Sequence, residues 1–213
     1  MLTNYGYSIS SNTLPTILSV EEFNQRTANK YVLDSRIEST IASATSTIRN
    51  YCGWHLATSV SCEIELTFDD LHIVQNGCDL LIQMPIRFFS SIDHIYLGAT
   101  KEDGHWTGDT CQYAFKPNGI VKIYNAPIYN RYDKVVIQFT AGLTSDLLDG
   151  LKAIITQRVA HTLSGVNTLG INSESAGGVS ISYNNTFVNN AKATALMSDE
   201  KEFLQPFKVS ELL

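Results

Sequence analysis

The stretch IESTIASATSTIRNYCGWHL, residues 37–56, decides how the N-terminal part of the chain is organised. Its apolar residues recur at the spacing of a single helix face: Ile37, Ile41, Ala44, Ile48 and Tyr51. The other positions are mostly serine, threonine and alanine, so the apolar stripe is narrow. Ser35-Arg-Ile-Glu38 forms a capping box, and Gly53 is typical of the residue just beyond a helix C-terminus. We therefore expect a helix that ends in a Tyr-Cys-Gly-Trp corner.

Two further helices are expected on either side of this region. Ser19-Val-Glu-Glu22 is a second capping box, flanked by Leu18 and Phe23 as a hydrophobic staple, so a short helix should run from about residue 19 to residue 29. Farther along, Ser145 is a candidate N-cap for a helix whose broader apolar stripe extends to Leu163. Because the two stripes can pack together, residues 18–56 and 144–168 should form a small helical bundle.

Between these helices, in residues 57–143, the apolar period changes from helical to two. Residues 60–68 alternate strictly, which predicts a half-buried strand with one wet face. Further strands are expected at 71–74, 80–84, 92–97, 113–115, 120–124 and 135–140. Lys116-Pro-Asn-Gly119 is a tight-turn sequence between two of them. The section is therefore expected to be an antiparallel sheet or small barrel inserted into the helical bundle.

Both ends of the chain read as extended segments. Residues 1–17 are polar and predict a flexible N-terminal arm. Residues 169–213 are predicted to be a flexible segment, in which Val179, Ile181 and Tyr183 alternate as in a strand, followed by a C-terminal tail with a short helix capped by Ser198. The expected fold class is α+β: a small helical bundle with an inserted antiparallel β-sheet or barrel section and extended termini.

Composition argues against several functional classes. The 213 residues carry a net charge of −6, and the fifteen lysines and arginines are scattered, which is unlike a protein that grips nucleic-acid phosphates. Four cysteines without a C-x-x-C pair predict reduced thiols rather than a zinc site or a disulfide framework. No secretory signal is recognisable at the N-terminus, and no apolar run reaches the roughly 20 residues of a membrane span.

Catalytic and cofactor-binding patterns are equally hard to find. The sequence has no nucleophile elbow, phosphate-binding loop or local zinc-protease spacing, so we expect no enzymatic activity, metal or cofactor. Two alternatives stay open. One is a hydrolase with a metal held by His94 and His105, and the other is a β module that binds carbohydrate or a protein partner through Tyr124, Tyr129 and Tyr132.

The order of short motifs along the chain carries more information than any one of them. The motifs are Ile37-Glu38, Tyr51-Cys52-Gly53, Met84-Pro85, Ser91-Ile92, Phe139-Thr140-Ala141-Gly142, and Ser173-Glu174-Ser175 through Gly178 to Ser180-Ile181-Ser182-Tyr183. In this order they resemble the head-tail connector, or adaptor, proteins of tailed bacteriophages. The resemblance extends over nearly the whole chain.

The resemblance implies a structural virion subunit without enzymatic activity. Such proteins form a ring, commonly of twelve copies, between the portal protein and the stopper or tail-completion protein, and DNA passes through the ring without sequence-specific binding. A net-acidic chain suits that role, because its lumen would not hold phosphate. The protein would be made in the host cytoplasm and reside in the virion neck, at the head-tail junction. Another neck role, as a stopper or tail-completion protein, is the close alternative.

A ring requires two different complementary faces on each subunit. We expect the polar face of the 37–56 helix and the later strand to supply inter-subunit contacts, through Ser43, Thr47, Arg49, Val179, Ile181 and Tyr183. The C-terminal tail is the candidate segment for portal docking, through Phe203, Leu204, Pro206, Phe207 and Lys208. The alternative for the tail is that it packs on its own subunit.

Overall fold

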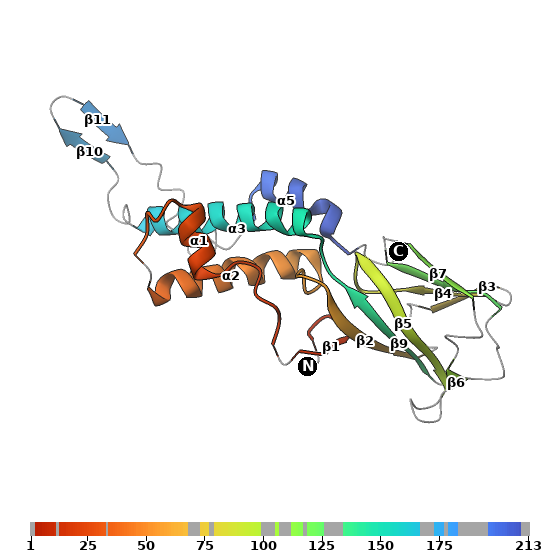
Figure 1. Cartoon of the computed structure of the whole chain (residues 1–213). Coiled ribbons are helices and arrows are strands. Elements are labelled where there is room, and N and C mark those ends of the chain that lie inside the picture. Colours follow the sequence, from red (N-terminus) through yellow and green to blue (C-terminus); the bar gives the residue numbers. More distant parts are fainter. Residues whose placement is uncertain are drawn as a thin grey trace. The chain divides into compact units, whose positions relative to one another are not determined.

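The structure is a computed structural model that describes residues 3–11, 13–32, 34–67, 73–76, 79–98, 105–106, 112–116, 119–125, 134–166, 173–176, 179–182 and 196–209 (Figure 1). The chain divides into two compact units. The first, here called the β unit, consists of Met1–Pro15, Cys52–Leu148 and Pro206–Leu213. The second, the helical unit, consists of Thr16–Tyr51 and Asp149–Gln205.

The helical unit contains most of the residues of four α-helices: α1 Val20–Arg26, α2 Ser35–Cys52, α3 Ser145–Val166 and α5 Ser198–Leu204. Ser19 caps α1 as expected, since its hydroxyl accepts a hydrogen bond from the Glu22 amide at 3.1 Å. The capping residue of α2 differs from the prediction. The Asp34 carboxylate accepts from the amides of Arg36 and Ile37, both at 3.0 Å, so Ser35 is the first helical residue and not the cap.

The apolar stripe of α2 is confirmed. Ile37, Ile41, Ala44 and Ile48 are all buried and Tyr51 is half-buried, and Gly53 follows the helix with a left-handed φ of +79°. On α3 the buried apolar residues are Leu148, Leu151, Ile155 and Val159. The helical unit also contains a hairpin that pairs β10 Ser173–Ala176 with β11 Val179–Ser182. The strand predicted around residues 179–183 is thus present as β11, whereas β10 was not predicted, and Tyr183 lies outside the described residues.

The β unit contains two antiparallel sheets. One has five strands in the order β1 Ser8–Ile9, β2 Val60–Thr67, β9 Lys134–Ala141, β5 Phe89–Gly98 and β6 His105–Trp106. The other has four strands in the order β3 Ile73–Asn76, β4 Asp79–Gln83, β8 Ile120–Ile123 and β7 Tyr113–Lys116. Within the described residues both sheets are open ladders, so the barrel alternative is wrong and the sheet alternative holds.

The core of the β unit lies between the inner faces of these two sheets. Alternate residues of the five-stranded sheet are buried, among them Ile64, Ile95 and Phe139. The four-stranded sheet buries Leu80, Ile82, Val121 and Ile123 in the same way. At one end the sheets touch directly, because the ring of Phe89 lies 6.1 Å from that of Phe115 and 5.1 Å from that of Phe139, and the Tyr113 hydroxyl donates to the Ile92 carbonyl at 3.1 Å.

The N-terminal segment is built into the β unit. β1 pairs with β2 in antiparallel register, Ser8 opposite Glu63 and Ile9 opposite Cys62. Thr3, Tyr7 and Ile9 are buried, and the Tyr7 hydroxyl lies 2.7 Å from Nδ1 of the buried His55. The expected flexible arm is therefore a packed strand and loop over residues 3–9. No helix in the described part of the chain is long and apolar enough to cross a membrane.

Candidate interaction surfaces

The described residues offer no cluster of three histidine, cysteine or acidic side chains that could hold a metal ion. His94 is exposed on β5, and His105 pairs with Leu97, three residues farther along that strand. Of the tyrosines in the carbohydrate alternative, Tyr124 is half-buried with the Lys122 amine 4.5 Å above its ring, while Tyr129 and Tyr132 lie outside the described residues.

The C-terminal tail comprises residues 196–209, and its last four residues, 206–209, pack in the β unit beside Cys52 and Trp54. The Trp54 indole donates to the Phe207 carbonyl at 2.7 Å, and the Val209 amide donates to the Cys52 carbonyl at 2.9 Å. The Phe88 ring lies 5.9 Å from Trp54 and 5.7 Å from Phe207. Phe207 is 4% exposed. The last described residues are thus part of the core of the β unit.

In the helical unit the same tail forms α5. Its Glu200 carboxylate accepts a hydrogen bond from Arg158 of α3 at 2.7 Å and another from the Met197 amide at 2.7 Å. The two side chains of this ion pair are 15% and 8% exposed. Phe203 lies over Gly150 of α3, where an added Cβ would come within 3.1 Å of its ring. α5 is therefore held on α3 by a largely buried ion pair and by close packing at a glycine.

These contacts show which of the five residues predicted for portal docking are accessible. Leu204 and Phe207 are buried within their own chain, Phe203 and Pro206 are exposed, and Lys208 is half-buried. The alternative in which the tail packs on its own subunit describes this arrangement. The sequence indicates aromatic residues at the end of the chain, but it does not indicate whether they face a partner or their own core.

The inter-subunit candidates on α2 differ in exposure. Ser43 is exposed, and Thr47 is half-buried with its hydroxyl donating to the Ser43 carbonyl at 3.0 Å. Arg49 is only 7% exposed, so its side chain lies inside its own subunit and not on the outer face of the helix. On β11, Val179 and Ile181 lie opposite Ala176 and Glu174, and their side chains are outside the described part of the chain.

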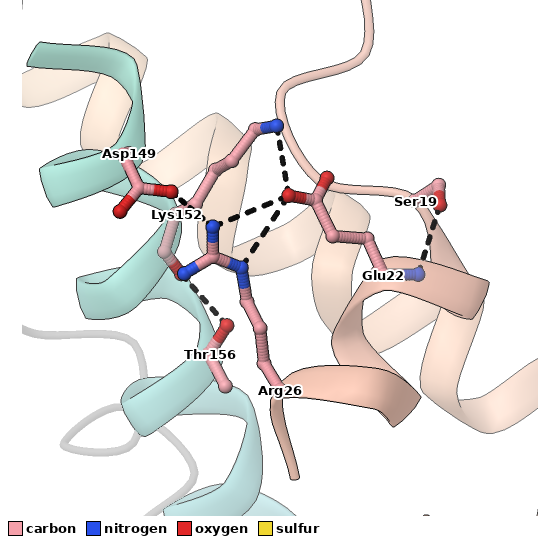
Figure 2. Close-up of polar contacts among 6 residues, drawn as sticks. All are labelled: Ser19, Glu22, Arg26, Asp149, Lys152 and Thr156. Carbon is pink, nitrogen blue, oxygen red and sulfur yellow. Dashed lines mark hydrogen bonds and ion pairs between the residues drawn. The ribbon is translucent and has the colours of Figure 1, made fainter. Parts of the chain in front are cut away.

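A polar network that the sequence did not predict joins α1 to α3 (Figure 2). The Glu22 carboxylate binds Lys152 at 2.8 Å and Arg26 at 3.3 Å, and Arg26 also pairs with Asp149. The hydrogen bond from Arg26 to Asp149 is the main cause that raises the pKa of this arginine. Because all four side chains remain partly exposed, the network orients α1 on α3 while contributing little stability.

The outer face of the five-stranded sheet carries a groove of about 420 Å³. Ser8, Glu63, Gln138 and His94 lie opposite one another in four successive strands and form a row across it. Gln138 donates to the Glu63 carboxylate at 2.6 Å. Asp93, which also lines the groove, accepts from the hydroxyls of Ser91 at 2.9 Å and Thr140 at 3.3 Å. The groove is thus flanked by two carboxylates held by neighbouring strands.

Two of the four cysteines lie in the described part of the chain, and both are reduced and buried, as expected. Burial raises the pKa of Cys52 to about 12, with nearby Lys208 acting in the opposite direction, and burial also raises the pKa of Cys62 to about 12. Both thiols are therefore protonated at neutral pH and serve as packing residues.

Comparisons with known proteins were made for sequence and for structure. Residues 16–191 match the sequence family described as head completion protein. None of the curated proteins matches the chain in sequence. Among solved structures, a chain in the neck of an empty gene transfer agent particle computed with C6 symmetry has a TM-score of 0.54 at 15% identity. A chain in the neck of the native particle with C12 symmetry scores 0.53 at 17% identity, and one in the virion of the native particle scores 0.55 at 14%. Each alignment covers 97% of both chains, so the fold is shared over its full extent.

Proposed function

The chain belongs to the head completion protein family, and on that premise we propose that it forms the connector ring between the portal and the stopper or tail of a phage-like particle. The family match over residues 16–191 is the observation that carries this proposal. It makes the chain a structural subunit of the neck. The proposal assigns it no reaction, metal or cofactor.

The ring itself is the finer part of the proposal. We infer twelve copies around the passage for DNA, with the portal protein on one side and a stopper or tail-completion protein on the other. The C6 and C12 symmetry of the neck particles with the same fold supports such a ring. The net charge of −6 supports a lumen that lets DNA pass without holding its phosphates.

We assign the contacts with the portal and with the neighbouring subunit to exposed residues of the tail and of α2. Phe203, Pro206 and Lys208 are proposed to meet the portal, because they are the tail candidates with exposed or half-exposed side chains. Ser43 and Thr47 are proposed to meet a neighbouring subunit for the same reason. Leu204, Phe207 and Arg49 are not among these contact residues, since their side chains are buried in their own chain.

The decisive experiment deletes the gene for this chain in the host that produces the particles and then supplies a labelled copy of the protein. We expect cells without the chain to accumulate filled heads that lack tails, and the labelled copy to lie at the head-tail junction in electron micrographs. Tailed particles in normal number without the chain, or particles without the labelled copy, would contradict the proposal. Binding of the chain to isolated portal in the absence of tail proteins would separate a connector from the stopper alternative.

A further inference from the structure

The β unit has two outer faces that point away from each other. The inner faces of its sheets meet through Phe89, Phe115 and Phe139 and are buried, so the opposite faces of the two sheets are turned outward in opposite directions. A subunit in a closed ring contacts its two neighbours through two different surfaces. These outer faces have the placement that such a contact needs, provided that their chemistry is complementary.

The outer face of the five-stranded sheet is polar and acidic. Its groove over Gln138 has Glu63 on one side and Asp93 on the other. Asp93 is exposed and is hydrogen-bonded by two hydroxyl groups, and no cation of the described residues pairs with it. These hydroxyls position the carboxylate without neutralising its charge, so the groove is suited to a basic side chain.

The outer face of the four-stranded sheet carries aliphatic residues and two lysines, of which Lys122 lies opposite Leu81 and is paired with Asp79. Val74 is 57% exposed and lies in register with the half-buried Leu81, while Ile120 lies in the neighbouring row between Gln83 and Lys116. Val74, Leu81 and Ile120 together form a small apolar strip on this face, here called the apolar strip, which a partner surface could cover. The exposed Lys116 stands at the edge of this apolar strip, where β7 enters its turn.

Lys116 differs from the other cations of the β unit in having no partner among the described residues. Lys134 pairs with Glu65, and Lys122 pairs with Asp79 at 2.9 Å. Arg87 donates to the Pro206 carbonyl at 2.6 Å. Lys208 has a further interaction within the chain. Lys116 is therefore the cation on the outer face of the four-stranded sheet that is available to another molecule.

We propose that a second copy of this chain binds here, so that Lys116 and the apolar strip of Val74, Leu81 and Ile120 dock on the groove between Glu63 and Asp93 of the next subunit. The contact is heterologous, because the two surfaces differ, and its repetition generates the ring. The aliphatic residues supply the apolar area, and the charges fix orientation and exclude wrong pairings. This inference rests on the proposed connector function and specifies the subunit contact within it.

Charge exchange between the two surfaces tests the contact. Host cells that lack the chain are supplied with full-length Lys116→Glu, Asp93→Lys or the double variant, and tailed particles are counted. Each single variant places like charges at every subunit contact, which should lower tailed particles about tenfold or more. The double variant restores an opposite-charge pair at each contact and should return the count to near the wild-type value.

Two further variants complete the test. Lys30→Glu, an exposed charge reversal in the helical unit, should leave the count unchanged. Val74→Arg should lower the count, because it inserts a charge into the apolar strip. Since Val74 is exposed, the substitution should leave folding intact, and thermal unfolding of each purified variant checks this.

The outcomes separate this inference from the proposed function. Single charge variants with wild-type counts would overturn the inference and leave the connector function standing. Single variants that fail without rescue by the double variant would also overturn it, because the surfaces would then bind a different protein. A wild-type copy that does not restore tails to the deletion strain would refute the connector function itself.

Discussion

Replacement of Phe207 by alanine tests whether the C-terminal tail is part of the subunit's own core. Its ring is 4% exposed and lies 5.7 Å from Phe88, and its backbone carbonyl accepts the indole hydrogen bond of the fully buried Trp54. Truncation of a buried phenylalanine costs about 3–5 kcal/mol, the sum of lost transfer energy and the cavity left behind. We expect Phe207→Ala to lower the free energy of unfolding by that amount in the isolated protein.

The assay is urea unfolding followed by tryptophan fluorescence, since Trp54 lies beside the cavity that the substitution creates. Phe203→Ala is the matched control: Phe203 is 43% exposed and packs over Gly150 of α3, so its truncation should cost clearly less, about 1–2 kcal/mol. If the two variants were equally stable, within about 0.5 kcal/mol of the wild type, the tail would not be packed in the free subunit. The buried tail would then be reserved for a partner, and the packing argument would fail.

Three other predictions concern stability and reactivity. Glu200→Ala should destabilise the protein by about 1–3 kcal/mol, because it removes a charge-assisted hydrogen bond to the buried Arg158. Arg26→Ala, in the partly exposed network of Figure 2, should cost about 1 kcal/mol or less, and less still at high salt. Urea unfolding at two salt concentrations measures both. Cys52 and Cys62 should resist iodoacetamide at pH 8 until the protein unfolds, and labelling of either residue in the folded protein would contradict this. Because the pKa of both thiols is about 12 in the folded protein, above the unfolded value, the free energy of unfolding should fall as the pH rises above about 9. Gly142→Ala should prevent stable folding, since its Cβ would lie 2.3 Å from the Ser59 amide nitrogen, and an unchanged melting temperature would refute that clash.

Local patterns in the sequence predicted the elements well because their periods are set by residues close together in the chain. The stripe of α2, the left-handed Gly53 and the alternation of β2 are all of this kind. Strand pairing is different, because β9 pairs with β2 and β5 from distant parts of the chain and no local signal specifies that order. β1 has two residues, too few to show a period, so the segment around it reads as a flexible arm.

Arg49 is a buried residue that a pattern based on hydrophobicity alone does not predict. Thr45 and Arg49 are four residues apart and both are buried, so the buried face of α2 is wider than its apolar stripe. Arginine has a long apolar stem that can be covered while its charge finds partners, which is invisible to a count of aliphatic positions. A polar residue next to an apolar stripe is therefore a weak indication of an exposed face.

The composition of the C-terminal tail likewise does not tell whether its residues face a partner or their own core. Phe203, Leu204, Pro206 and Phe207 have the composition of a docking peptide, and that composition is also what a chain uses to close its own core. In the β unit, Trp54 and Cys52 supply a donor and an acceptor that are satisfied by the tail's Phe207 and Val209. Removal of the tail would leave both buried polar groups without these partners, a cost of about 1–3 kcal/mol for each. A tail that left this position to reach the portal would have to recover that loss at the new contact. The exposed Phe203 and Pro206 can bind a partner without that cost, which is the energetic reason for assigning the portal contact to them.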